Sequence, residues 1–537
     1  MLPPASVQAH SITVDGNPSD WDPTGYAMNP PTTDDTGHIG RDSSSQGQYI
    51  WKDKANDELT SGTDPDTNYD LTEFRVTADS TNLYFLAVFS DTTSTTMPYL
   101  AIAIDLDQDG TGNTAFQDDA DTSVSANARW EREVVVNSNK TGYFDESLTW
   151  NSVGSSDIST ANNVIEVSMP LSGLGISPPG RVRFTVLVGE HNDSGGIKDI
   201  ASSSDALDAV ANASDTSTEL GDGDIDYFFD VWFNSSNEPY APLLITEVMY
   251  DPADENSEWI QITNVAGVGI TLTDYKLGDE ETRGGTEGMK VFPSGVITSG
   301  SIIVAVKASN FNTVYGFDPH YEFVNSKAGV PNMGPSSWAT GSVDLANGGD
   351  EVLLLDGSDT VIDAITYESG SYPGVTSHSG VPDCTTSPCK SLERFPQTTD
   401  TNDTSSDFRI VDGNGTPEQS TYIELASFTA TPHDGYVLLQ WETASEIDNA
   451  GFNLWRSEAE AGSYAKLNAD LIPARGGPTT WASYSYVDDA IINGVTYWYK
   501  LEDVDVHGAS TFYGPVSATP YRLRRIYLPL GLKGSTP

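Results

Sequence analysis

The chain contains 537 residues, more than one hydrophobic core usually holds, so we expect several domains. With 26 Lys and Arg residues against 78 Asp and Glu residues, its formal net charge is −52, a field that repels phosphate backbones and argues against nucleic acid as a partner. The hydrophobic fraction of 37% is too high for a disordered acidic chain, and no stretch approaches the roughly 18 apolar residues of a membrane-spanning helix. We therefore expect folded domains and no membrane insertion.

Residues 1–11, MLPPASVQAHS, form either a flexible N-terminal arm or the remnant of a signal peptide. Val7 and Ala9 fit the small residues that precede a signal-peptidase cleavage site. The composition, rich in Asp, Ser, Thr, Gly and Asn and poor in Lys, favours a secreted, extracellular protein associated with the cell surface. Asn-x-Ser/Thr sequons provide candidate glycosylation sites at Asn139, Asn192, Asn212, Asn234, Asn402 and Asn414.

Short segments of alternating apolar and polar residues recur along the chain, separated by Gly, Asp, Asn, Pro and Ser clusters. This pattern is typical of strands joined by turns. In residues 225–233, IDYFFDVWF, one strand face would carry Ile225, Tyr227, Phe229, Val231 and Phe233. The predicted fold class is all-β, with three consecutive immunoglobulin-like or jelly-roll-like sandwiches and a short basic, apolar C-terminal tail.

Two Pro-containing stretches, NEPYAP at 237–242 and GTPEQS at 415–420, interrupt the strand pattern and mark joints between domains. The predicted organisation is therefore an arm, three sandwiches and a tail. Their bounds are 1–11 for the arm, 12–238, 239–420 and 421–520 for the sandwiches, and 521–537 for the tail.

The first predicted sandwich contains ITVDGNPSDWD at 12–22, GQYIWKDKANDE at 47–58 and NLYFLAVFSD at 82–91. In the first of these, DGNP at 15–18 predicts a turn that is followed by an anchoring Trp21. In these segments it resembles family 9 carbohydrate-binding modules and the glucodextranase-type sandwich, and the resemblance implies a sugar-associated module. Sugar binding needs exposed aromatic faces beside hydrogen-bonding groups. Candidates are Trp51, Trp130, Trp150 and Trp232, although packing in a core explains each of them as well.

The motif DLDQDG at 105–110 places carboxylates at positions 1, 3 and 5 and a glycine at position 6, which suits a loop that curls around a hard cation. It departs from an EF-hand because Phe116 occupies the twelfth position and the flanks have strand patterns. A solvated acidic turn is the alternative. The predicted cofactor is a structural Ca²⁺ bound by Asp105, Asp107, Asp109, Asp118, Asp119 and Asp121.

The second predicted sandwich contains LLITEVMYDP at 243–252, SEWIQITNVAGVGITLTDYKL at 257–277 and LANGGDEVLLLDGSDTVIDAITY at 345–367. These segments resemble the lamin tail domain, an immunoglobulin-like sandwich, which implies a non-catalytic tethering or interaction module. Gln261 stands where that family usually carries an acidic residue. Cys384 and Cys389 lie in the short loop DCTTSPCK and predict a local disulfide, with free thiols or half of a metal site as alternatives.

The third predicted sandwich contains VLLQWETASEIDNAGFNLWRSEAE at 437–460 and YSYVDDAIINGVTYWYKLEDVD at 484–505. It resembles a fibronectin type III domain, with Trp441, Tyr497 and Tyr499 at core positions. The tail YRLRRIYLPLGLKGSTP is basic and apolar on an acidic protein, which suits addition as an edge strand to another copy, although docking on its own domain explains it as well. The predicted assembly residues are Ile526, Tyr527, Leu528, Leu530 and Leu532.

The sequence contains no GxSxG, HExxH or phosphate-loop motif, and its seven histidines show no ligand spacing, so we expect a protein without enzymatic activity. The leading hypothesis is an extracellular structural or adhesive protein that assembles head to tail with itself into a filament or layer. The alternative is an accessory protein that binds a polysaccharide through its first sandwich. A hydrolase with an acidic cleft is the third hypothesis.

Overall fold

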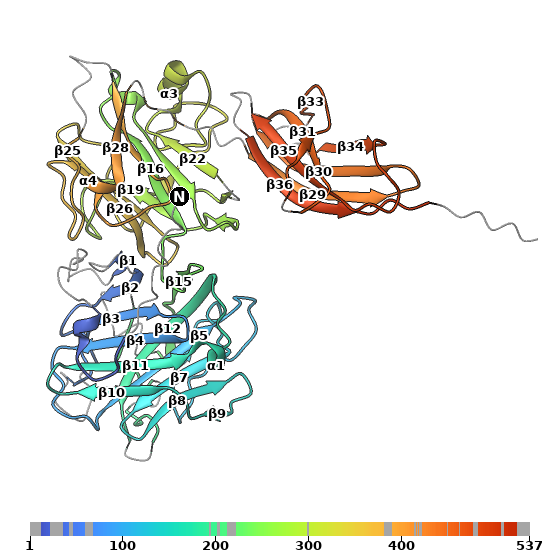
Figure 1. Cartoon of the computed structure of the whole chain (residues 1–537). Coiled ribbons are helices and arrows are strands. Elements are labelled where there is room, and N and C mark those ends of the chain that lie inside the picture. Colours follow the sequence, from blue (N-terminus) through green and yellow to red (C-terminus); the bar gives the residue numbers. More distant parts are fainter. Residues whose placement is uncertain are drawn as a thin grey trace, which may run out of the picture. The chain divides into compact units, whose positions relative to one another are not determined.

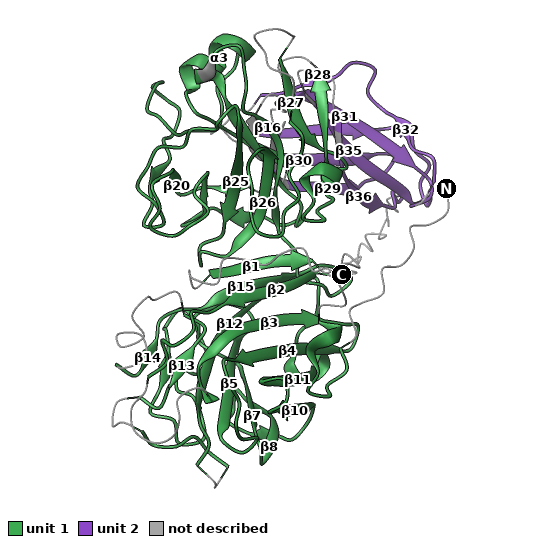
Figure 2. Ribbon diagram, turned by 90° about the vertical axis from the view of Figure 1, so that its left-hand side faces the viewer, with its two compact units in different colours: residues 1–417 green, residues 418–537 purple. Residues whose placement is uncertain are grey.

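The computed structural model describes residues 12–21, 36–41, 47–59, 68–192, 195–200, 204–211, 222–297, 300–380, 389–412, 415, 417, 422–447, 449–460, 462–475, 482–505 and 510–522. The chain forms two compact units, residues 1–417 and 418–537 (Figure 2). Strands provide nearly all of the regular structure in both units, so the all-β prediction is confirmed. Within the described ranges, no helix is both long and apolar enough to cross a membrane.

The first sandwich consists of two sheets with the strand orders β10-β11-β4-β3-β2-β1 and β13-β12-β5-β7-β8-β9, and β15 pairs with β12 as well. The first sheet contains β1 (Thr36–Arg41), β2 (Gly47–Lys52), β3 (Leu71–Ala78), β4 (Asn82–Phe89), β10 (Ser155–Ser159) and β11 (Val164–Pro170). The second contains β5 (Pro98–Asp105), β7 (Arg132–Asn137), β8 (Lys140–Asp145), β9 (Trp150–Asn151), β12 (Gly180–Glu190), β13 (Asp208–Ala209) and β15 (Phe229–Phe233). The short strands β6 (Ser123–Val124) and β14 (Asp224–Ile225) pair with each other, and the short helices are η1 (Pro18–Asp20) and α1 (Leu171–Leu174).

The alternation in residues 225–233 produces the expected two faces. The five residues predicted for the inner face, Ile225, Tyr227, Phe229, Val231 and Phe233, are all buried. The intervening residues, Asp226, Phe228, Asp230 and Trp232, are exposed or half-buried. The alternation therefore predicts the buried residues correctly, although the segment is not one strand: β14 ends at Ile225 and β15 begins at Phe229, and the two belong to different sheets.

The N-terminal segment of the first sandwich is held by a buried carboxylate. Gly16 adopts a left-handed φ of 72°, and the amide of Gly16 donates a hydrogen bond of 2.7 Å to Glu166 on β11. Trp21 is buried and donates its indole N–H to the same carboxylate at 3.0 Å. The predicted turn and its anchoring tryptophan are thus present, and residues 1–11 lie outside the described part.

The second sandwich continues the first sheet with the strand order β26-β25-β19-β20-β24 and adds a sheet of the order β23-β22-β17-β16-β27-β28. Their bounds are β16 (Leu243–Met249), β17 (Trp259–Asn264), β19 (Lys276–Gly278), β20 (Met289–Val291), β22 (Gly300–Ala305), β23 (Tyr321–Glu322), β24 (Gly334–Pro335), β25 (Gly349–Leu355), β26 (Val361–Glu368), β27 (Lys390–Arg394) and β28 (Phe408–Asp412). A separate pair is formed by β18 (Ile270–Thr271) and β21 (Val296–Ile297), and the helices are η3 (Glu255–Ser257), α3 (Ala308–Tyr315) and α4 (Thr404–Asp407).

The two sandwiches of the first unit share one sheet. β1 pairs in parallel with β26 at His38 and Val361, so that an 11-stranded sheet runs through both (Figure 1). One hydrophobic cluster likewise extends from Ile39 in the first sandwich to Phe408 in the second. The predicted boundary at 238/239 therefore falls inside a compact unit, between β15 and β16, whereas the division at 417/418 lies close to the predicted boundary at 420.

The second unit is a sandwich of two sheets, β29-β30-β34 and β32-β31-β35-β36, with β33 paired to β31. The strands are β29 (Tyr422–Pro432), β30 (Val437–Ile447), β31 (Asn449–Ser457), β32 (Ala465–Lys466), β33 (Ile472–Pro473), β34 (Ala482–Asp488), β35 (Tyr497–Asp505) and β36 (Ser510–Ala518). Trp441 is fully buried and stacks on Tyr484 at 5.0 Å between ring centroids. Tyr497 and Tyr499 are also buried, as expected for core positions.

Candidate functional site

Three carboxylates meet where β5 ends and β7 begins. Asp105 is the last residue of β5, Asp107 lies in the loop that follows, and Glu131 immediately precedes β7. Antiparallel pairing of the two strands brings Glu131 beside the end of β5, where its amide donates to the Ile104 carbonyl at 3.1 Å. One carboxylate oxygen from each of Asp105, Asp107 and Glu131 lies within 4.8 Å of the other two. We call this group the β5–β7 carboxylate cluster.

The β5–β7 carboxylate cluster is partly withdrawn from water. Asp105 is 4% exposed and Glu131 is 8% exposed, whereas Asp107 is exposed. Burial raises the pKa of Glu131 to about 7, and the charges of Asp105 and Asp107 contribute to the rise. Burial also raises the pKa of Asp105. The cluster therefore brings three carboxylates together where little water reaches them, which favours the binding of a proton or a cation.

The hydrogen bonds of Glu131 leave one oxygen free. Oε2 accepts a bond of 2.8 Å from the amide of Leu106, while Oε1 is enclosed and, within the described ranges, accepts no hydrogen bond. A Cβ atom at Gly112 would lie 2.5 Å from this Oε1, so the loop backbone approaches the carboxylate closely. Gly112 has a φ of 99°, a conformation that glycine adopts without strain.

Of the six predicted calcium ligands, Asp105 and Asp107 belong to the β5–β7 carboxylate cluster, and the other four lie elsewhere. Asp109 is exposed and accepts a bond of 2.7 Å from the amide of Thr111. Asp118 forms an ion pair with Lys140, and Asp119 and Asp121 are exposed. Sequence analysis missed Glu131 because it lies far along the chain from the DLDQDG motif. Its only local signal is an acidic residue at the start of a valine-rich strand pattern.

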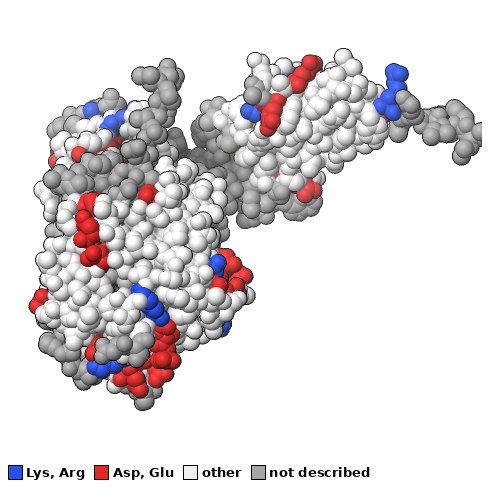
Figure 3. All heavy atoms as spheres, turned by 60° about the horizontal axis from the view of Figure 1, so that its bottom comes forward, with Lys and Arg blue, Asp and Glu red and all other residues white. Residues whose placement is uncertain are grey.

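Two further groups of three carboxylates have oxygens within 4.8 Å of one another, among the residues that the structure describes. One consists of Asp53, Asp57 and Asp208 in the first sandwich, and the other of Glu281, Glu287 and Glu351 in the second. Burial raises the pKa of Glu351 to about 9, with the neighbouring acids Asp350 and Glu281 adding to the effect. Acidic groups thus gather at several places in the first unit. Figure 3 shows Asp and Glu patches on one face of the molecule, interspersed with Lys and Arg.

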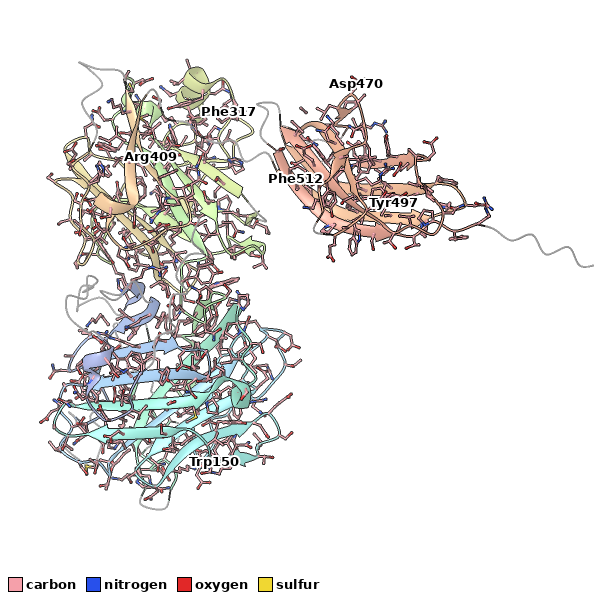
Figure 4. All side chains as sticks on the ribbon, viewed as in Figure 1. Trp150, Phe317, Arg409, Asp470, Tyr497 and Phe512 are labelled. Carbon is pink, nitrogen blue, oxygen red and sulfur yellow. The ribbon has the colours of Figure 1, made fainter. Side chains whose placement is uncertain are left out.

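The four candidate sugar-stacking tryptophans occupy different environments. Trp51 and Trp130 are fully buried, so their rings are not available to a sugar. Trp150 is half-buried on β9, packs against Phe144 at 5.0 Å between centroids and lies at the edge of the first sandwich (Figure 4). Trp232 is half-buried and lines a cavity. Only Trp150 and Trp232 therefore keep ring surface that a ligand can reach.

The cavity beside Trp232 has a volume of about 380 Å³ and lies where the two sandwiches of the first unit meet. The first sandwich contributes Trp232, Phe228 and the guanidinium groups of Arg181 and Arg183, and the second contributes residues 269–275 and 356–358, including Tyr275. Arg183 binds Asp230 through two nitrogens at 2.8 and 3.0 Å. We call this the junction cavity. Its lining is mostly polar and charged, with the rings of Phe228, Trp232 and Tyr275 among these groups, and its volume lies within the range of small-ligand pockets.

The remaining sequence-predicted residues fall partly outside the described ranges. Asn139 is exposed at the turn between β7 and β8, Asn192 and Asn234 are half-buried, and Asn402 is 3% exposed, which leaves no room for a glycan on it. Asn212 and Asn414 lie outside the described residues. Cys389 is buried and disulfide-bonded, while Cys384 is outside the described part. The assembly residues 526–532 are outside it as well.

One family model matches part of the chain. Residues 236–369 match the model of the lamin tail domain, in agreement with the resemblance noted for the second sandwich. Among solved structures, the chain is similar to an Fn3-like protein from Clostridium thermocellum, with 17% identity over 20% of this chain and 100% of that one and a TM-score of 0.14. It is also similar to a DUF4876 family protein from Bacteroides thetaiotaomicron (11% identity, 61% and 95% coverage, TM-score 0.25) and to domains FN1-FN3 of chicken CNTN1 (8%, 84% and 98%, TM-score 0.16). No curated protein matches the chain.

Proposed function

We propose that this protein is a non-enzymatic structural or adhesive protein of the cell surface. The observation that carries the proposal is the continuous 11-stranded sheet, which joins the first two sandwiches into one compact unit. Modules joined by a flexible linker move independently, whereas modules that share a sheet and a core hold a fixed spacing. A fixed spacing is what a surface spacer or an adhesive stalk requires.

Side chains reinforce this joint beyond its single pair of bridged residues. His38 and Tyr372 form a buried hydrogen bond of 2.9 Å across the joint, and the Tyr227 hydroxyl donates to the Ser358 carbonyl at 2.9 Å. Burial lowers the pKa of His38 to about 3, so this imidazole stays neutral at physiological pH. These two hydrogen bonds connect buried polar groups of the two sandwiches, which opposes bending at the joint.

Self-assembly through the C-terminal tail is part of the proposal. The net charge of −52 makes separate copies repel each other, whereas the tail at 521–537 carries Arg522, Arg524, Arg525 and Lys533. Attraction between a basic, apolar tail and an acidic sandwich of the next copy would join different surfaces on the two chains. Such a contact repeats without closure and yields a filament or layer.

The assembly is tested by light scattering and negative-stain microscopy of the purified full chain. A variant that ends at residue 520 removes the tail, and the double variant Arg524→Glu, Arg525→Glu keeps its length while reversing its charge. We expect elongated assemblies for the full chain and single molecules for both variants. A full chain that stays monomeric at its solubility limit, with and without calcium, would overturn the assembly.

The junction cavity favours a second candidate function, the binding of a carbohydrate chain. Trp232 offers a half-buried ring for stacking on a sugar, and Arg181 and Asp230 offer hydrogen-bonding groups beside it. Glycan-array binding of the full chain tests this function, with Trp232→Ala as the disrupting variant and Trp150→Ala as the control outside the cavity. Loss of binding in the first variant alone supports the site, and binding that persists in it excludes the cavity.

A further inference from the structure

We propose that Asp105, Asp107 and Glu131 bind a Ca²⁺ ion that ties the end of β5 to the start of β7. The inference does not depend on the proposed function, because it rests on the β5–β7 carboxylate cluster alone. It also changes the ligand set that the DLDQDG motif suggests, since Glu131 replaces the acidic residues at 109 and 118–121.

The spacing of the three carboxylates suits one shared cation. Their oxygens lie within 4.8 Å of one another, and two oxygens bound to one Ca²⁺ at roughly 2.3–2.6 Å each are separated by no more than about twice that distance. Calcium accepts about six to eight oxygen ligands in flexible geometry, which leaves positions for loop carbonyls and water. Magnesium demands a tighter octahedron and keeps more of its own water, so it fits an irregular loop less well.

The free oxygen of Glu131 is a second, independent observation. Glu131 is 92% buried, and its Oε1 is enclosed without a hydrogen-bond partner in the described part of the chain. An unsatisfied buried oxygen is costly, and a carboxylate oxygen costs more than a neutral one. A Cβ atom added at Gly112 would lie 2.5 Å from this oxygen, so the loop passes close to it.

The charges around the cluster are not balanced by protein cations. Across the described ranges, none of the three carboxylates forms an ion pair with Lys or Arg. Arg183 is the basic residue whose charge acts on Asp105, and it is already bound to Asp230 through two nitrogens. Asp105 accepts backbone hydrogen bonds from Gln108, at 2.7 Å, and from Asp107, and Asp107 accepts one from the amide of Asp109 at 3.2 Å.

The ion closes the loop between two neighbouring strands, so it stabilises the first unit and leaves the second unit unchanged. A ligand that binds only the folded state raises stability in proportion to the logarithm of its concentration over its dissociation constant. We therefore expect the thermal midpoint of the first unit to rise with calcium concentration.

The test uses the full chain, freed of metal and titrated with Ca²⁺ in a calorimeter, together with thermal unfolding in chelator and in calcium. Glu131→Gln and Asp107→Asn preserve side-chain shape while removing a charge. Asp109→Asn is the matched control in the same loop, because Asp109 is exposed and lies outside the cluster. We expect one calcium ion per chain to be bound in this loop, at least tenfold weaker binding in the two cluster variants, and unchanged binding in the control.

A further readout separates loss of the site from loss of the fold. Glu131→Gln removes a buried negative charge beside two others, so in chelator this variant unfolds at or above the wild-type temperature while its response to calcium disappears. Calcium binding that is equal in wild type and Glu131→Gln would overturn the proposal, as would an equal stabilisation by Mg²⁺ at the same concentration.

Discussion

Arg394 on β27 is only 1% exposed, and its environment explains how a buried cation is retained. It binds Asp363 through two contacts of 2.9 Å and lies 3.3 Å from Asp400 and 3.4 Å from Asp407. Its Nε also donates to the Ile245 carbonyl at 2.8 Å. The planar guanidinium satisfies several acceptors at once, which a lysine ammonium cannot do with the same geometry. Arg394 thus holds β16, β26 and the segment before β28 together.

We expect Arg394→Met to lower the free energy of unfolding of the first unit by about 3–5 kcal/mol, because it leaves the buried Asp363 carboxylate without its partner. Burial already raises the pKa of Asp363 to about 7, so the loss should be smaller at pH 5, where this group is protonated. Urea unfolding at pH 5 and pH 8 measures both values. Arg409→Met serves as the control, since Arg409 is half exposed beside Glu393 and should cost at most about 1 kcal/mol. Equal effects of the two substitutions would contradict this account.

At the scale of single elements, β2 begins at a position where only glycine fits between two segments of backbone. Gly47, the first residue of β2, lies so close to the chain entering the second sandwich that an added Cβ would fall 1.9 Å from the Pro239 carbonyl oxygen. The neighbour is backbone, which cannot rotate away. The absence of a side chain at this position therefore permits β2 to lie against the chain segment at Pro239.

Gly47→Ala should destabilise the first unit by about 1–3 kcal/mol, the usual cost of forcing an extra methyl group into a packed site. Gly180→Ala is the matched control, because Gly180 begins β12 in the same sandwich and an added Cβ there meets nothing within 4 Å. The control should change stability by no more than about 0.5 kcal/mol. Chemical denaturation of the two variants and the wild type measures the three free energies of unfolding. A Gly47→Ala protein as stable as the wild type would show that the packing around Gly47 is looser than the structure indicates.

At the scale of the whole molecule, the two compact units have separate hydrophobic cores. The core of the first unit runs through both of its sandwiches, and the core of the second is centred on Trp441, Tyr484 and Phe452. Residues that share one hydrophobic core tend to unfold together. Each unit should therefore melt in one transition, although the chain contains three sandwiches.

Differential scanning calorimetry of the full chain should therefore show two transitions. Trp441→Ala should lower the midpoint temperature of the second unit's transition alone, because it leaves a cavity at the centre of the second core. The expected loss of unfolding free energy is about 3–5 kcal/mol. Arg394→Met should lower only the midpoint temperature of the first unit's transition. Three separate transitions, or a shift of both by one substitution, would contradict the division into two cooperative units.

The pH dependence of stability is a second property of the whole first unit. Burial raises the pKa values of Glu131, Asp279, Asp356 and Asp363 to about 7. These groups hold protons in the folded state that they lose on unfolding, where their pKa values are about 4. Their contribution to stability is fully present below about pH 4 and is lost as the pH rises through about 7. In calcium-free buffer the melting temperature of the first unit should thus rise as the pH falls from 8 to 5. A fall in this temperature would show that these acids are hydrated in the folded state.

Local patterns predicted much of the fold correctly. The alternation in 225–233 identified its buried face, the DGN turn preceded a buried tryptophan, and Trp441, Tyr497 and Tyr499 occupy the core expected for them. These features depend on residues close together in the chain, whose geometry follows from the period of a strand and the preferences of a turn. The motif at 105–110 likewise indicated where two carboxylates would lie, because both belong to one short loop.

The sequence by itself determined the all-β class, the inner faces of its strands, the acidic character of the molecule and the position of the loop at 105–110. Tertiary structure decided that Glu131, rather than the acids at 118–121, stands beside Asp105 and Asp107, and that β1 and β26 merge two predicted sandwiches into one unit. Both outcomes depend on which distant strands pair and in which register. The register of two strands depends on which residues the whole sheet buries, so it cannot be predicted from a short segment of sequence.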